Sequence, residues 1–100
     1  MTLHNLSIPE PELADFCRRH NVARLSLFGS ILRDDLGPDS DIDALVAFPP
    51  DQTPSLLDLG GVLMELRRIF GREVDLKTPA SLSRHFRDDV VRGARLVYAA

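Results

Sequence analysis

The spacing of hydrophobic residues changes repeatedly along the first half of the chain. Over residues 10–20, apolar side chains recur at i, i+3, i+4 and i+7, which predicts a helix. Residues 23–28 instead alternate between polar and apolar and are rich in strand formers, which predicts a strand. A serine that can cap a short helix over residues 30–36 follows, and then a Gly-Pro-Asp-Ser turn at 37–40. Residues 41–48 predict a mostly buried strand that begins with two acidic residues.

The second half predicts a long helix, a short strand and a final helix. Ser55 is a favoured N-cap for a helix over residues 55–70, whose leucines keep helical spacing, and Gly71 is a favoured residue just past its C-terminus. Residues 73–77 predict a short strand. A stripe of apolar residues at near-helical spacing predicts a last helix over residues 83–98.

The order αβαβαβα predicts an α/β (α+β) fold, in which a small three-stranded mixed sheet is flanked by about four helices. A chain of 100 residues is expected to form a single domain over residues 1–100, because a chain of this size supports one hydrophobic core. A separate substrate-binding domain does not fit into this length.

Composition excludes several classes of protein. Hydrophobic residues make up 44% and charged residues 27%, as in a globular rather than a disordered domain. Neither a transmembrane run nor a signal-peptide pattern is present, so a cytoplasmic location is expected. The single cysteine, Cys17, excludes a disulfide framework, and its spacing from His20 is better explained by packing in the core than by metal binding. A net charge of −3 argues against stable binding to nucleic acid.

Three candidate site residues are aspartates that lie on two of the predicted strands. Asp41 and Asp43 are two apart at the start of a strand, so their carboxylates face the same side. Two such carboxylates repel each other unless a cation lies between them, and hard oxygen ligands select Mg²⁺ or Mn²⁺. If the strand over residues 73–77 is the neighbour, Asp75 faces the same cleft and is either a third metal ligand or a general base.

Upstream of these aspartates, the chain carries the features of a phosphate-binding turn. Gly29 allows close approach to the backbone, and Ser30 adds a hydroxyl donor at the start of the predicted helix, whose N-terminus attracts anions. Arg33 lies one turn further on, where it can pair with a phosphate oxygen. A phosphate site beside two carboxylates is suited to metal-assisted phosphoryl or nucleotidyl transfer.

The pattern of Gly-Ser, ten further residues, Asp-x-Asp and a third aspartate on a later strand resembles the DNA polymerase β-like nucleotidyltransferase superfamily. Its nearest resemblance is to the minimal nucleotidyltransferases (MNT), which are encoded beside HEPN-domain partners. The resemblance covers nearly the whole chain and implies a palm-like fold. It assigns phosphate or nucleotide binding to Gly29, Ser30 and Arg33, and metal binding and catalysis to Asp41, Asp43 and Asp75.

The resemblance also implies an activity and a partner. Such proteins act as antitoxins by transferring AMP from ATP to a tyrosine of a HEPN ribonuclease toxin, with Mg²⁺ or Mn²⁺ as cofactor. The expected partners are therefore a nucleoside triphosphate and a HEPN toxin, with a homo-oligomer as a further option and no membrane.

Several simpler or competing interpretations remain open. The chain can be a binding module that neutralises its partner by occlusion, without catalysis. Modification of a small molecule is a weaker alternative, because antibiotic-modifying relatives use an additional helical domain to enclose the acceptor. Individually, Asp75 can be a solvent-facing residue of an edge strand, and Arg33 an exposed helix residue paired with a nearby aspartate. The arginines near the C-terminus are interpreted as a solvated helix face, with contact to a partner or to RNA as the alternative.

Overall fold

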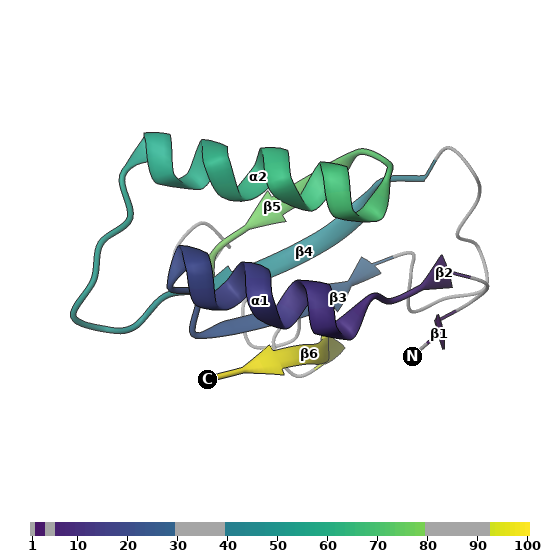
Figure 1. The fold of residues 1–100 in the computed structure, drawn as a ribbon, viewed down its shortest axis with the longest axis horizontal. Coiled ribbons are helices and arrows are strands. Elements are labelled where there is room, and N and C mark those ends of the chain that lie inside the picture. Colours follow the sequence, from purple (N-terminus) through teal and green to yellow (C-terminus); the bar gives the residue numbers. More distant parts are fainter. Residues whose placement is uncertain (1, 4–5, 30–39, 80–92) are drawn as a thin grey trace.

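The computed structural model describes residues 2–3, 6–29, 40–79 and 93–100, and in this part of the chain two helices lie across one face of a four-stranded sheet (Figure 1). The helices are α1 (Glu10–His20) and α2 (Leu56–Phe70). The sheet is formed by β3 (Arg24–Phe28), β4 (Ile42–Ala47), β5 (Val74–Lys77) and β6 (Arg95–Ala99). Two short strands, β1 (Thr2–Leu3) and β2 (Leu6–Ser7), form a separate antiparallel pair near the N-terminus.

The sheet is mixed, as the sequence predicts. Its strand order is β5-β4-β3-β6, with β3 antiparallel to both of its neighbours and β4 parallel to β5. The parallel pair is possible because α2 crosses over the sheet between the two strands. The strands predicted at residues 23–28, 41–48 and 73–77 are thus confirmed within one residue at each end.

Alternation of side chains along the strands separates the two faces of the sheet. On the face covered by the helices, the side chains of β3 and β4 are fully buried at Leu25, Leu27, Ile42, Ala44 and Val46. These residues pack in one core with Leu13, Phe16 and Cys17 of α1 and Val62 and Leu66 of α2. Residues at the intervening positions of the strands point to the opposite face.

Cys17 packs in this core, as the sequence interpretation expected. Its side chain is fully buried, and desolvation raises the pKa of the thiol to about 12. The nearby Arg18 opposes this shift but does not cancel it. The thiol therefore stays protonated at neutral pH, so Cys17 is a small apolar core residue rather than a nucleophile.

Helix α2 begins and ends where the sequence places its signals. Ser55 and Asp58 form a capping box, in which the Asp58 amide donates to the Ser55 hydroxyl at 3.0 Å and the Ser55 amide donates to the Asp58 carboxylate at 2.9 Å. Gly71 ends α2 in the left-handed conformation, and Asn21 ends α1 in the same way. These signals fix the lengths of the two helices that cover the sheet.

The prediction of a last helix extending to residue 98 is wrong over its final part. Arg95–Ala99 is strand β6, which pairs with β3, and the sheet therefore has four strands rather than three. Leu96, Val97 and Tyr98 are strand formers, and pairing them with β3 satisfies hydrogen-bonding groups that an edge strand would expose. Helical spacing through Val97 was therefore misleading. The rest of that predicted helix, up to residue 92, and the helix predicted at 30–36 lie outside the described residues.

None of the described helices is long and apolar enough to cross a membrane.

Candidate functional site

Asp43 and Asp75 lie side by side on neighbouring parallel strands. Asp43 of β4 is the register partner of Asp75 of β5, and on its other side it is the register partner of Phe28 of β3. All three residues belong to the set that points away from the helices, so they form one row across that face. The sequence prediction that Asp75 faces the same side as Asp43 depended on the two strands being neighbours, and they are.

Asp41 lies two residues before Asp43, at the entrance to β4. Two contacts hold this entrance against the start of β5: the Ile42 amide donates to the Glu73 carbonyl at 2.9 Å, and the Arg72 guanidinium donates to the Ser40 carbonyl at 3.2 Å. The backbone on both sides of Asp41 is therefore fixed, while its side chain is exposed. This leaves the Asp41 carboxylate accessible next to the row of Asp43 and Asp75.

Gly29 packs directly against Asp43. A Cβ atom added at position 29 would lie 2.1 Å from Oδ2 and 2.9 Å from Cγ of Asp43, and Gly29 also has a φ of +76°. Both facts exclude a larger residue, because the conformation is strained for L side chains and the space is already filled. The turn after β3 thus brings the backbone into contact with the half-buried carboxylate of Asp43. The other two residues of the predicted phosphate site, Ser30 and Arg33, lie outside the described residues.

Lys77 is a residue of this region that the sequence analysis did not single out. Its ammonium lies 3.4 Å from Oδ1 of Asp75, and both side chains are roughly half exposed. Strand alternation places Lys77 on the same face as Asp75, two residues further along β5. The two-residue periodicity of a strand could have identified Lys77 from the sequence.

The aspartates Asp41, Asp43 and Asp75 offer oxygen donors of the kind that bind a divalent cation. Among the residues that the structure describes, no three His, Cys, Asp or Glu side chains come together closely enough to hold an ion. Mg²⁺, however, is usually bound by one or two carboxylates together with substrate phosphates, rather than by a closed protein cage. Asp41 and Asp43 supply hard oxygen donors, so the residues fit a cation that binds together with a triphosphate.

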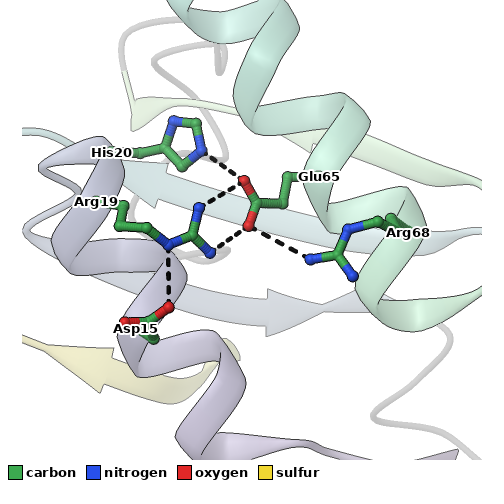
Figure 2. Close-up of polar contacts among 5 residues, drawn as sticks. All are labelled: Asp15, Arg19, His20, Glu65 and Arg68. Atoms are coloured by element: carbon green, nitrogen blue, oxygen red, sulfur yellow. Dashed lines mark hydrogen bonds and ion pairs between the residues drawn. The ribbon is translucent and has the colours of Figure 1, made fainter.

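A second polar cluster connects α1 with α2 on the helical side of the molecule (Figure 2). Glu65 of α2 accepts hydrogen bonds from Arg19 at 3.0 Å and contacts His20 at 2.9 Å, and Arg19 also contacts Asp15 at 3.0 Å. Hydrogen bonds from Arg19, and then from His20, lower the pKa of Glu65 to about 2. Arg68 adds an ion pair at 3.5 Å. Because the cluster joins the end of α1 to the middle of α2, its role is to fasten the two helices together.

A cavity of about 250 Å³ lies beside this cluster, between the end of α1, the loop before α2 and α2 itself. Its lining includes Arg19, His20 and Asp58, whose side chains are engaged in the ion pairs and the helix cap. The lining contains none of the predicted site residues, so this cavity belongs to the junction between the helices and not to the aspartate row.

Comparison with known proteins identifies the family. A family model described as a nucleotidyltransferase domain matches residues 11–97. The chain belongs to this nucleotidyltransferase family. The matched range includes all of α1 except its first residue, the whole of α2, the row of aspartates, Gly29 and most of β6.

Individual relatives agree with this assignment. A Methanocaldococcus jannaschii protein whose inferred activity is protein adenylylation is 40% identical over 76% of this nucleotidyltransferase and 80% of its own length. A solved structure, assigned by inference as a minimal nucleotidyltransferase, has 34% identity, a TM-score of 0.75 and coverage of 94% of both chains. This likeness confirms the mixed α/β fold predicted from the sequence.

A more distant structure shares the fold alone. It is a complex of an AMP-modified Shewanella oneidensis HEPN toxin with an MNT antitoxin, and the matching chain has 20% identity and a TM-score of 0.64. The match covers 91% of this nucleotidyltransferase and 70% of the other chain. The α/β core described above is therefore a framework that persists at low sequence identity.

Proposed function

We propose that this nucleotidyltransferase transfers AMP from ATP to a tyrosine hydroxyl of a HEPN-type toxin, in the cytoplasm, and so acts as an antitoxin. The observation that carries the proposal is the contact of Gly29 with Asp43, together with the pairing of Asp43 with Asp75 on the face away from the helices. The name of the M. jannaschii relative and the AMP-modified toxin in the S. oneidensis complex support the type of reaction and the type of partner.

We assign a role to each residue of the proposed site. Gly29 lies in the turn at the end of β3 with a φ of +76°, and we assign the triphosphate to this turn together with Ser30 and Arg33. Asp41 and Asp43 would hold Mg²⁺ or Mn²⁺. When bound, such a cation neutralises phosphate charge and polarises the phosphate that is attacked.

Asp75 is assigned to the acceptor side of the reaction, where it would also be a further ligand of the cation. Its exposed carboxylate lies beside Asp43, where it can orient the acceptor hydroxyl and take up its proton. The hydroxyl oxygen then forms a bond to the α-phosphorus of ATP, and the bond from that phosphorus to the bridging oxygen breaks. Pyrophosphate leaves with the bonding electrons, and AMP remains on the tyrosine.

The transfer is tested directly with a co-purified HEPN partner and ATP radiolabelled at the α-phosphate. We expect label on the partner in the presence of Mg²⁺, and a decrease of at least about 100-fold in rate for Asp43→Asn. Asp51→Asn is the matched control, because it removes the same charge from an exposed residue in the loop before α2. Full activity of Asp43→Asn with an intact fold would rule out the proposed site.

A second candidate function is inhibition of the partner by occlusion alone. The observation in its favour is that the Asp75 carboxylate is engaged by the Lys77 ammonium at 3.4 Å. Intact mass of the partner after co-expression separates the two functions. A mass increase equal to one or more AMP groups supports transfer, whereas an inhibited partner of unchanged mass supports occlusion.

A further inference from the structure

Lys77 is the only lysine of the chain, and it lies at the candidate site. The sequence has 12 Lys and Arg residues, of which 11 are arginine. The ammonium of this single lysine lies 3.4 Å from the Asp75 carboxylate.

The register of the sheet shows how close Lys77 is to the aspartate row. Asp43 pairs with Asp75, and in the next same-side row Leu45 pairs with Lys77. The ammonium thus projects from the row beside the aspartates and reaches back along β5 to Asp75. In the described structure the charge of Asp75 is balanced by Lys77 from within its own strand.

Lysine and arginine differ in how firmly they hold a carboxylate. Arginine presents a planar fork that can bind both carboxylate oxygens, whereas lysine is a compact point charge on a flexible stem. The exposed fractions of the Lys77 and Asp75 side chains are 41% and 47%, so the pair is solvated. Exposed ion pairs of this kind shift an equilibrium by no more than roughly fivefold. This pair is therefore easily broken by a stronger competitor for the carboxylate.

We propose that Lys77 is a positioning residue that holds Asp75 before substrate binds and is displaced from it by the incoming divalent cation and triphosphate. This inference rests on the proposed function, because it takes Asp75 as part of the nucleotidyl-transfer site. The ammonium lies 3.4 Å from Oδ1 of Asp75 and so offsets part of the negative charge that Asp75 places beside Asp43. Once released from Asp75, the Lys77 ammonium is a cation beside the site to which we assign the triphosphate.

The single lysine makes the displacement directly observable by NMR. Protein labelled with ¹⁵N only in lysine gives one side-chain ammonium signal, which needs no assignment among other lysines. We expect this signal to shift when Mg²⁺ and a non-hydrolysable ATP analogue are added to the wild type. In Asp75→Asn without ligand, the ammonium signal should already have the chemical shift of a lysine that is not paired with a carboxylate. A signal that does not move, or moves equally in Asp75→Asn, would overturn the proposal.

Competition for Asp75 also predicts tighter binding of a cation when the ammonium is removed. We expect Lys77→Met to lower the Mn²⁺ concentration for half-saturation by about two- to fivefold, measured by electron paramagnetic resonance. Arg24→Met is the charge-matched control, since Arg24 is exposed on the same face but at the start of β3. For Lys77→Arg, the Mn²⁺ concentration for half-saturation should equal or exceed the wild-type value.

The double variant Asp75→Asn/Lys77→Met separates a direct contact from a general effect of charge. Its Mn²⁺ affinity should equal that of Asp75→Asn alone, because the group for which the ammonium competes is absent. An equal gain in both backgrounds, or an equal gain from Arg24→Met, would refute the direct role. Neither measurement requires AMP transfer. A chain that shows this competition but does not modify a partner would therefore retain the inference and lose the proposed function.

Discussion

The carboxylate of Asp43 fills the space in which residue 29 would carry a side chain. Oδ2 of Asp43 would be 2.1 Å from a Cβ atom at that position, and the backbone of Gly29 has a φ of +76°. The end of β3 and the middle of the aspartate row are therefore a single packed unit, and a change at either residue affects the other.

Substitution of Gly29 by alanine should damage stability and activity together. The backbone strain costs about 1–2 kcal/mol, and the methyl group must displace the Asp43 side chain. We expect a lower free energy of unfolding in urea and a loss of AMP transfer. Gly71→Ala is the control, because Gly71 has a φ of +69° but no atom within 4 Å of its added Cβ. It should show the cost in stability without the loss of transfer, and the same result for both variants would contradict the contact.

The ion pairs of Glu65 should make stability depend on pH in the acid range. The pKa of Glu65 is lowered to about 2 in the folded protein, mainly by Arg19, so the folded state favours the ionised carboxylate. This contribution is complete above the unfolded-state pKa of about 4.3, and it is lost as the pH falls towards 2. Glu65→Gln should thus be destabilised by about 1 kcal/mol at pH 7.

The difference between Glu65→Gln and the wild type should shrink as urea titrations are repeated from pH 5 down to pH 2. Glu12→Gln, at an exposed position of α1, should show no such convergence. A constant difference across this range would show that Glu65 stabilises the protein by packing and not by charge.

Features of the site were predictable where they depend on neighbouring residues in the sequence, and not where they depend on contacts between distant segments. Asp43 and Asp75 were predicted on one face because strand alternation is a local property, and only the adjacency of β4 and β5 had to be assumed. The contact of Gly29 with Asp43 was not predictable, since it joins the end of one strand to the side chain of another. The clustering of Arg19 and His20 around Glu65 was missed for the same reason, because it requires the packing of α1 on α2.

Within the described residues, the four-stranded sheet was predictable except at its C-terminal edge, and the short β1–β2 pair was not predicted. The strand signals over residues 23–28, 41–48 and 73–77 are short and dense, and each became a strand. Residues 95–99 have both helical spacing and strand-forming composition, and the outcome was decided by pairing with β3, which is a tertiary effect. A local pattern could not reveal that β3 needed a second partner.

The buried thiol of Cys17 offers a probe of the core. With its pKa raised to about 12 and its side chain fully buried, Cys17 should react with a thiol reagent at pH 8 far more slowly than a free cysteine. The rate should rise sharply in urea, in parallel with the loss of circular dichroism. Rapid reaction in the native state would show that α1 separates from the sheet without global unfolding.

Binding of nucleotide should stabilise the fold through the aspartates. A ligand at 100 times its dissociation constant adds about 2.7 kcal/mol, which raises the Tm of a domain of this size by roughly 10–20 °C. We expect this shift with ATP and Mg²⁺ together, a much smaller shift with ATP alone, and its reversal by a chelator. Asp43→Asn should abolish most of the shift, whereas Asp51→Asn should keep it. If Asp43→Asn were stabilised as strongly as the wild type, the nucleotide would have to bind away from the row of Asp43 and Asp75, and the turn at Gly29 would lose its assigned role.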